Sequence, residues 1–414
     1  MGLYGTKSMD DLKLRLLSSV YGKIEQVLIV LPGIQTGASE EECLEIIQTF
    51  EKDRGVHIFF QEKPGVSIRV TSKSYRSFDI EKKSLMVVHN NARPVFRMRA
   101  NLNIESLLTR WKRELDDLNR GKEVYYRRWA QDPFLVLASR YQQVLLESYY
   151  SSCLTDHFLA LQIAESTDLN LFIKPSRLII EGGNILCMEN VAFIGSELIE
   201  KNVKAHACSP EEILELFRSS LGVEEVIEIG ISQKLDAARK QPLFHIDLFV
   251  TLGGRSKDSA NDLVFIGSPV LTEELLDASH LDQEVQKSEI EPTDIERWHL
   301  VDQCFSSNYR LVRLPIFFRE GVCYSWNNAL VEIYGEEKRV FLPSYQTMKD
   351  TELLNPTFEV LENEVERRFQ EEGFEVVWIR SGKFFRIIAS HGGSLHCATK
   401  VLKRSRKGDM ANEV

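Results

Sequence analysis

Short runs of β-branched and apolar residues recur along the whole chain, and this rhythm constrains the fold more than any other feature. Each run has the length of a strand and ends at a turn former, as in "QVLIVLPG", "VAFIGS" and "DLVFIGS". The runs lie at 26–33, 56–62, 84–90, 133–139, 177–186, 191–196, 226–231, 244–252, 262–268, 310–318, 339–344 and 374–382. Helical patterns lie between several of them. The expected order is two strands, a helix and another strand, which predicts an α/β architecture of several similar modules.

The helical patterns carry apolar residues at helical spacing, as over 104–120. The clearest helix begins in "SPEEILELFRSSLG". Ser209 is the expected N-cap, Pro210 occupies the first turn and Glu212 completes a capping box. Gly222 follows the last expected turn, where glycine commonly ends a helix. We therefore expect a helix that begins after Ser209 and ends before Gly222.

The composition is that of a globular protein. The chain has 414 residues, of which 43% are hydrophobic and 27% charged, enough for one large domain or two modest ones. We interpret the polar, turn-rich stretches 252–262 and 281–296 as surface excursions from one domain, with a true linker as the alternative. We expect a single domain over 1–404, followed by a basic, flexible tail over 405–414.

The charge pattern bears on partners and location. A net charge of -10 argues against general affinity for nucleic acid or an anionic membrane, because such binding requires clustered Lys and Arg. A cationic substrate would be attracted instead. Asp10, Asp11, Lys13 and Arg15 interrupt the apolar core that a signal peptide needs, and polar residues break the apolar stretch 178–194. We expect a cytoplasmic protein with neither nucleic acid nor membrane as a partner.

The cysteines predict reduced thiols. They are odd in number, widely scattered and without a C-x-x-C pair, which favours neither a disulfide framework nor a zinc site. They stand at Cys43, Cys153, Cys187, Cys208, Cys304, Cys323 and Cys397. No metal site is expected.

A few polar, chemically reactive residues stand inside or beside apolar runs, where burial without a partner would cost several kcal/mol. They are Asp132 in "QDPF", Glu181 in "EGGN", His245 and Asp247 in "HIDLF", and Cys397 in "GGSLHCATK". If "HIDLF" is a strand, its imidazole and its carboxylate share one face.

Each of these residues also has a structural interpretation. His245 and Asp247 could be a hydrogen-bonded pair. The paired glycines of "EGGN" allow close backbone approach or φ > 0 beside the carboxylate, and the structural alternative is a β-bulge with a turn glutamate. Asp132 precedes a proline, as in an ordinary turn. Cys397 could be a small buried hydrophobe, although its place after two glycines and beside His396 sets it apart from the other cysteines.

Taken together, the carboxylates, the imidazole and the thiol would suit a planar cation. Carboxylates can clamp the N–H groups of a guanidinium in pairs, while a thiolate faces its central carbon. A bound cation would also favour the ionised, nucleophilic form of the thiol. The residues therefore indicate a small cationic guanidino substrate.

The motifs "WAQDPF", "EGGNI", "HIDLF" and "GGSLHCATK", in this order, resemble the guanidino-group-modifying (pentein) superfamily. This superfamily includes agmatine, arginine and peptidylarginine deiminases, dimethylargininases and amidinotransferases. The resemblance extends from Arg127 to Arg404, and residues 1–120 match by pattern only. "EGGNI" and "GGSLHC" are most similar to agmatine deiminases, "QDPF" also to arginine deiminases, and "RWAQD" to peptidylarginine enzymes. The substrate stays open between agmatine, arginine and an arginine derivative, peptidyl-arginine included.

The resemblance implies a fold and a set of roles. The fold would be a five-bladed α/β propeller of ββαβ modules with pseudo-fivefold symmetry, and the site would lie in its central channel. Cys397 would be the nucleophile, His245 the general acid and base, and Glu181 the partner that orients His245 or touches the guanidinium. Asp132 and Asp247 would clamp the guanidinium. The implied reaction is hydrolysis to a ureido product and ammonia through a thiouronium intermediate, with no cofactor.

The resemblance also implies substrate contacts from two asparagines. It leaves open how a substrate carboxylate would be bound and whether the protein is a hydrolase. The asparagines are Asn184 of "EGGNI" and Asn328, with Asn327 as the alternative to the latter, in "YSWNNALVEIYGEEKRVFLPSY". Gln131 stands where agmatine and arginine deiminases usually carry arginine. A substrate carboxylate would need an arginine, for which the candidates are Arg177, Arg255, Arg313 and Arg386. An amidinotransferase and a non-catalytic binding protein are the alternatives to a hydrolase, and the sequence indicates no oligomeric state.

Overall fold

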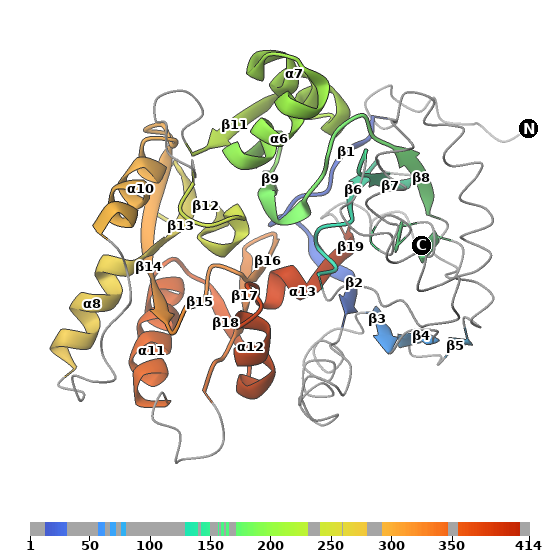
Figure 1. The fold of residues 1–414 in the computed structure, drawn as a ribbon. Helices are drawn as coiled ribbons and strands as arrows, with labels where there is room; N and C mark the ends of the chain where they lie inside the picture. The colour runs from blue at the N-terminus through green and yellow to red at the C-terminus, as the bar shows by residue number, and fades with distance from the viewer. Residues whose placement is uncertain are drawn as a thin grey trace, which may run out of the picture.

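The protein has a mixed α/β fold. The computed structural model describes residues 13–30, 57–62, 67–71, 76–79, 129–139, 142–149, 156, 159–160, 163–164, 171–230, 241–258, 260–279, 292–346 and 355–405. In this part of the chain the strands form five sheets. The longer helices lie on the outer side of the sheets, whereas the short helix α13 (Leu395–Ala398) lies near the middle of the described elements (Figure 1).

The sheets take strands from distant parts of the chain. One sheet has the order β1-β6-β7-β8, with strands Arg15–Leu16, Phe134–Ala138, Gln143–Glu147 and Phe172–Pro175. A second, β11-β10-β9, has strands Glu225–Ile229, Val191–Gly195 and Ile185–Met188. A third, β12-β13-β14-β15, has strands Val250–Arg255, Asp262–Ser268, Tyr309–Arg319 and Val322–Ser325.

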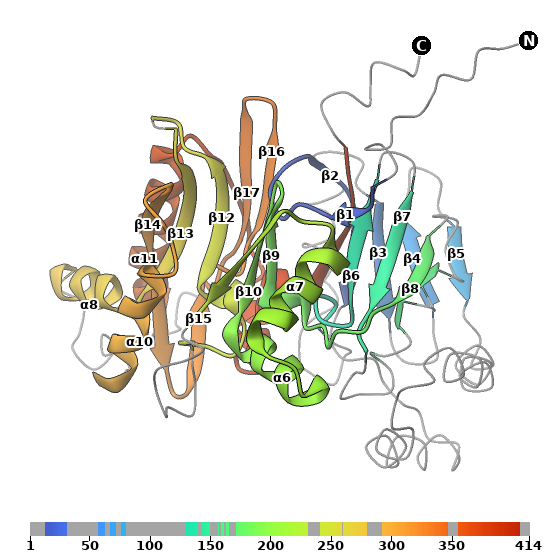
Figure 2. The same ribbon diagram turned by 90° about the horizontal axis from the view of Figure 1, so that it is seen from above.

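The other two sheets complete the described set. One, β16-β17-β18, has strands Leu330–Tyr334, Glu337–Pro343 and Glu375–Ile379. The last, β19-β2-β3-β4-β5, has strands Thr399–Ser405, Lys23–Val30, His57–Glu62, Ser67–Thr71 and Arg76–Asp79. Seen from above, the sheets extend from β13 and β14 on one side to β4 and β5 on the other (Figure 2).

Every one of these sheets contains the same unit, an antiparallel pair of strands joined by a parallel third. The units are β6-β7-β8, β9-β10-β11, β12-β13-β14 and β16-β17-β18. In the fifth unit β19 pairs antiparallel with β2, and β3 joins β2 in parallel. Because β19 and β2 come from opposite ends of the described chain, this unit holds both ends in one sheet.

In three of the units the described residues between the second strand and its parallel partner form helices. Helices α6 (Ser196–His206) and α7 (Pro210–Leu221) lie between β10 and β11. Helices α8 (Pro269–Ala278) and α10 (Pro292–Asp302) lie between β13 and β14, and α11 (Asn355–Glu371) lies between β17 and β18. The expected order of two strands, a helix and a strand is thus confirmed in these units. No described helix is long and apolar enough to cross a membrane.

Helix α7 has the ends that its sequence predicts. The Ser209 hydroxyl accepts from the amide of Glu212 at 3.2 Å, and the Glu212 carboxylate accepts from the amide of Ser209 at 2.8 Å. Gly222 ends the helix with φ +65°, in the left-handed region that favours glycine. Ile213, Phe217 and Leu221 are buried, so the apolar stripe of the helix faces the core.

Two expected strands begin later than the apolar pattern indicates. Over 177–186, the strand β9 begins only at Ile185, and Gly182–Asn184 forms a 3₁₀ turn, η3. Over 244–252, the strand β12 begins only at Val250, and Ile246–Leu248 forms a second 3₁₀ turn, η4. The predictions of continuous strands there were wrong, and both turns carry candidate site residues.

Other expectations have mixed outcomes. The excursion expected over 252–262 is confirmed only in part, because β12 continues to Arg255 and β13 begins at Asp262, which leaves a short surface turn between the two strands. The helix expected over 104–120, the strand expected over 84–90 and the stretch 281–291 lie outside the described residues, as does the tail from 406 onward.

The largest apolar core reaches from the N-terminal strand β2 to α13. Its buried members include Val27 of β2, Phe265 of β13 and Phe341 of β17. Leu395 and Cys397 of α13 belong to the same cluster, with 1% and 4% of their surface exposed. This packing fixes α13, and with it the candidate nucleophile, against the core.

Candidate active site

The candidate residues share one position in the repeated unit, just before its first strand. Asp132 precedes β6, Glu181 precedes β9, and His245 and Asp247 precede β12. Asn184 also precedes β9, and Asn328 and Cys397 precede β16 and β19 in the same way. The entry turns of all five described sheets therefore contribute to one cluster, although the turns are far apart in the sequence.

The Cys397 thiol is buried in this cluster and held by Asn328. The side-chain amide of Asn328 donates to Sγ at 3.2 Å, and its oxygen accepts from the backbone amide of Cys397 at 3.0 Å. Sγ also lies 3.5 Å from Oδ2 of Asp247. Burial raises the pKa of the thiol well above its ordinary value, and the negative charges of Asp247 and Asp132 raise it further. At neutral pH the unliganded site therefore holds a protonated thiol.

Asp247 joins the thiol to a histidine. Nδ1 of His396 lies 2.7 Å from Oδ2 of Asp247, the same oxygen that faces the thiol. The other oxygen, Oδ1, is buried and has no hydrogen-bond partner among the described residues. A buried carboxylate oxygen without a donor is costly, so this atom is a natural acceptor for a ligand N–H group.

His245 lies between two other carboxylates. Its Nδ1 is 3.8 Å from Oδ1 of Asp132, and its Nε2 is 3.7 Å from Oε2 of Glu181. Burial alone would lower the pKa of His245, but Asp132, Glu181 and Asp247 outweigh it and raise the pKa to about 9. His245 is consequently an imidazolium at neutral pH, able to give a proton.

Glu181 is held by a lysine from α6. The ammonium of Lys201 lies 2.7 Å from each oxygen of the Glu181 carboxylate. Burial would raise the pKa of Glu181, but its contacts with His245 and Lys201 lower it to about 2. Glu181 therefore stays ionised and can orient the imidazolium of His245.

Asp132 is fixed by the glycine pair of "EGGN". The amide of Gly183 donates to its Oδ1 at 3.0 Å. Burial raises the pKa of Asp132, and the charge of His245 and the Gly183 amide offset part of that rise. The carboxylate is therefore placed beside His245 by backbone that can approach it closely.

Gly183 shows why this backbone must be glycine. A Cβ atom at position 183 would lie 2.5 Å from Nδ1 of His245 and 3.2 Å from Oδ1 of Asp247, where no side chain fits without movement. Gly393, before α13, is similar, because a Cβ there would lie 2.5 Å from the Trp129 ring and 3.0 Å from Cβ of Cys397. The close backbone approach predicted for the "EGGN" glycines is confirmed.

The asparagines differ in what they contact. Asn184 is fully buried and bonds only protein groups in the described part of the chain, among them the Phe244 carbonyl at 3.0 Å and the Ile246 amide at 3.3 Å. Its expected substrate contact stays a prediction, and its hydrogen bonds favour holding η3 against η4. Asn328 bonds the thiol, whereas Asn327 bonds Thr251 and the Phe265 carbonyl. Of the two, Asn328 is the one at the site.

The arginines considered for a substrate carboxylate are mostly engaged elsewhere. Arg313 pairs with Asp302, and Arg255 donates to the Ala260 carbonyl. Arg386 donates from Nε to the Tyr345 carbonyl at 2.6 Å. These three bonds all lie outside the cluster of entry turns.

The sequence analysis named neither of two lysines that contact the site, the exposed Lys201 and the buried Lys400. Lys201 pairs with Glu181 across the fold, and its position on α6 carries no local signal of this contact. Lys400 is only 5% exposed and donates to the Gln131 carbonyl at 3.0 Å. Lys400 could have been noticed in the sequence, because it is a charged residue close after the candidate nucleophile Cys397, in the second position of strand β19.

The comparisons with known proteins bear on the fold. No protein-family model and no curated protein sequence matches the chain. Among solved structures, an agmatine deiminase from C. jejuni is 13% identical, with a TM-score of 0.53 over 95% of this chain and 98% of that one. An agmatine deiminase of Enterococcus faecalis is 12% identical, with a TM-score of 0.52 over 94% and 96% of the two chains.

A protein provisionally named a peptidyl-arginine deiminase is 17% identical, with a TM-score of 0.53 over 95% and 99% of the two chains. Each likeness extends over nearly the whole length of both partners. The chain has a pentein fold. This confirms the resemblance drawn from the motifs at the level of the fold, and any account of the chemistry rests on the site itself.

Proposed function

We propose that this pentein is a cysteine-dependent guanidino-group deiminase. The observation that carries the proposal is the convergence of one thiol, one imidazolium and three carboxylates from the entry turns of different sheets. Cys397, His245 and Glu181 would be the catalytic residues. Asp132 and Asp247 would bind the substrate.

A guanidinium would supply the hydrogen-bond donors that this cluster lacks. Oδ1 of Asp247 is buried without a donor, and a guanidinium offers five N–H donors in a planar fork. Asp132 accepts from the Gly183 amide, and a Cβ atom at position 183 would lie 3.2 Å from Oδ1 of Asp247, so both carboxylates border this glycine and could bind one planar cation. The Cys397 thiol, 3.5 Å from Asp247, would then face the central carbon.

The bound cation would also activate the nucleophile. Burial and the charges of Asp247 and Asp132 keep the thiol protonated in the free enzyme. A guanidinium between these carboxylates would neutralise their effect and stabilise a thiolate instead. The side-chain amide of Asn328, 3.2 Å from Sγ, would donate a hydrogen bond to that thiolate. Ionisation of the thiol would therefore depend on substrate binding.

The reaction would proceed in two halves. The Cys397 thiolate would attack the guanidinium carbon, and the tetrahedral adduct would expel ammonia as His245 protonates the departing nitrogen. This leaves a thiouronium on Cys397. Water, deprotonated by His245, would then attack the same carbon, and the C–S bond would break to give the ureido product and the free thiol. Glu181 would hold the imidazole in place through both halves.

The repeated unit supports a finer account of the architecture. We propose that the five sheets form a five-bladed propeller with pseudo-fivefold symmetry and that the site lies in its central channel. The equivalent position of the site residues before each unit's first strand supports this arrangement. The single domain over 1–404 and the cytoplasmic location stay predictions.

The first test is ammonia release and ureido formation from agmatine, free arginine, methylated arginines and an arginine-containing peptide. Cys397→Ser should abolish turnover of whichever substrate is used. Cys208→Ser, at a half-buried cysteine on the α6–α7 turn, is the matched control and should keep full activity. Loss of the amidino group without ammonia, in the presence of an acceptor amine, would indicate an amidinotransferase. The absence of turnover with every one of these substrates would indicate a binding protein.

A further inference from the structure

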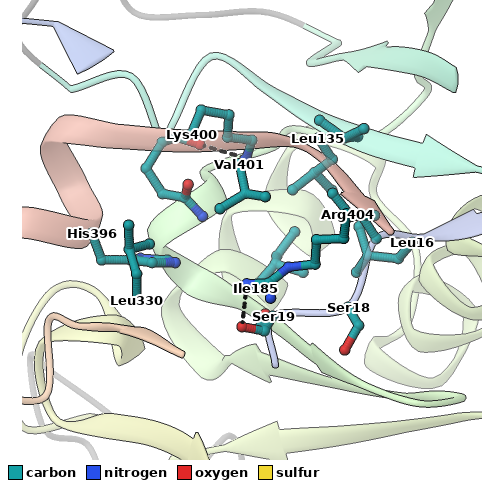
Figure 3. A pocket seen from close by; sticks show the side chains of 13 residues that line it. Leu16, Ser18, Ser19, Leu135, Ile185, Leu330, His396, Lys400, Val401 and Arg404 are labelled. Atoms are coloured by element: carbon teal, nitrogen blue, oxygen red, sulfur yellow. Dashed lines mark hydrogen bonds between the residues drawn. The ribbon is translucent and has the colours of Figure 1, made fainter. Parts of the chain in front are cut away.

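A small cavity lies beside the candidate site, between the N-terminal segment and the last strand (Figure 3). Its walls include Ser18, Ser19, His396, Lys400 and Arg404. Its volume is about 40 Å³, and a water molecule needs about 10–15 Å³ of such space. The cavity therefore has room for a few waters or for one small ion.

Two cationic side chains from β19 are buried at this cavity. Lys400 is 5% exposed and Arg404 is 7% exposed. The pairing of β19 with β2 shifts in register between Val401 and Lys403, and again between Lys403 and Arg404. These bulges interrupt the alternation of the strand, so that Lys400, Val401 and Arg404 all line one cavity.

Neither cation forms an ion pair with a carboxylate of the described residues. Lys400 donates to the Gln131 carbonyl, and its ammonium stands 5.6 Å from the centre of the Phe134 ring. The Nη atoms of Arg404 donate to the backbone carbonyls of Ser19, Val20 and Gly22. Its Nε is buried and has no hydrogen-bond partner in that part of the chain.

The cost of burying these two charges is only partly offset by nearby carboxylates. It lowers the pKa of Arg404 to about 9, with no opposing charge. It lowers the pKa of Lys400 to about 7, more than Asp132 and Asp247 raise it. Neither basic side chain has an ion-pair partner among the described residues, which is unfavourable for a buried charge. An anion bound between the two side chains would supply that partner.

Two hydroxyl groups at the cavity also lack an acceptor. The Ser18 hydroxyl accepts from the amides of Val20 and Tyr21, and the Ser19 hydroxyl accepts from the amide of Cys187. Each hydroxyl still has one proton to donate, and no acceptor for it is present among the described residues. The walls of the cavity are thus rich in donors and positive charge.

We propose that this cavity binds one small monoanion of the size of chloride, between Lys400 and Arg404, with the Ser18 and Ser19 hydroxyls as further donors. The small volume favours a halide over sulfate or phosphate. The proposal does not depend on deiminase activity, because it rests on the cavity and its donors alone.

The first experiment compares thermal unfolding of the full chain in sodium chloride with that in sodium gluconate at equal ionic strength. Chloride should lower the unfolding equilibrium constant by the factor 1 + [Cl⁻]/Kd, about tenfold at about nine times Kd. Sulfate, which stabilises proteins generally because it is excluded from their surface, should stabilise the wild type and Lys400→Met equally. Lys400→Met should lose the chloride dependence. Lys403→Met is the matched control, because Lys403 lies on the same strand, is 48% exposed and pairs with Glu25, and it should keep the dependence.

A second experiment needs no variant. Crystals of the wild-type chain grown in bromide should show one anomalous scattering peak in contact with the Lys400 ammonium and the Arg404 Nε. Equal stability in chloride and gluconate would overturn the proposal, and so would bromide crystals without a peak in the cavity.

Discussion

Replacing Gly183 by alanine would disturb the candidate active site at one defined point. The added Cβ would lie 2.5 Å from Nδ1 of His245, whereas an ordinary contact is 3.4–4 Å, so the ring or the turn must move by about 1 Å. A misplacement of this size in a catalytic group costs about 10²-fold in rate. We therefore expect kcat for ammonia release to fall about 10²-fold in Gly183→Ala.

The matched control is Gly321→Ala, in the turn between β14 and β15. A Cβ there meets nothing within 4 Å, but φ is +71°, so alanine should cost about 1–2 kcal/mol of stability through backbone strain alone. Urea unfolding should show both variants folded and destabilised, while kcat falls only in Gly183→Ala. A folded Gly183→Ala enzyme with the wild-type kcat would refute the placement of His245 in the reaction.

Three further predictions follow from the contacts of the site. Asn328→Ala removes the hydrogen bonds to the Cys397 thiol and amide, and stopped assays should show kcat reduced about 10- to 100-fold with the fold intact. His245 and Lys201 together lower the Glu181 pKa to about 2, and Lys201→Gln removes the second of them, so the midpoint of acid unfolding should move to higher pH than in the wild type. Lys204→Gln, on the same helix and 73% exposed, should leave that midpoint unchanged. The pKa of His245 is raised from 6.5 to about 9, so its contribution to stability is present below pH 6.5 and is lost as the pH rises through 9. Urea unfolding of His245→Gln should lack this alkaline loss.

The sequence was sufficient to name candidate residues that the fold brings together, but not to predict the local structure that presents them. "LIIEGGNIL" and "LFHIDLFV" have the composition of strands, yet each contains a 3₁₀ turn before the strand begins. The turns are stabilised by tertiary contacts, such as the bonds of Asn184 to the Phe244 carbonyl and the Ile246 amide. A periodic pattern of apolar residues carries no information about such partners, because buried residues in a turn and in a strand are equally apolar.

The charged groups that surround the site could not be predicted from the sequence either. Lys201 reaches Glu181 from the helix that follows β10, and Lys400 reaches the Gln131 carbonyl from a strand at the other end of the chain. The pairing of β19 with β2 likewise joins opposite ends of the chain. Contacts of this kind arise from how modules are placed beside one another, which local propensity does not encode.

The local signals that were explicit in the sequence gave correct structure. The capping box of Ser209 and Glu212 and the terminal Gly222 fixed the ends of α7, since each acts through neighbouring backbone groups. The glycine pair of "EGGN" was also informative, because close approach of backbone is a property of glycine wherever it occurs.

The central claim is that Cys397 forms a covalent intermediate with the guanidino carbon. It can be tested by acid quenching of the wild-type enzyme during a single turnover of its substrate, followed by mass analysis of the peptide that contains Cys397. The account predicts an adduct with the mass of the substrate less ammonia on Cys397 alone, absent from Cys397→Ser. Ammonia release without any adduct on Cys397, or undiminished turnover by Cys397→Ser, would contradict it.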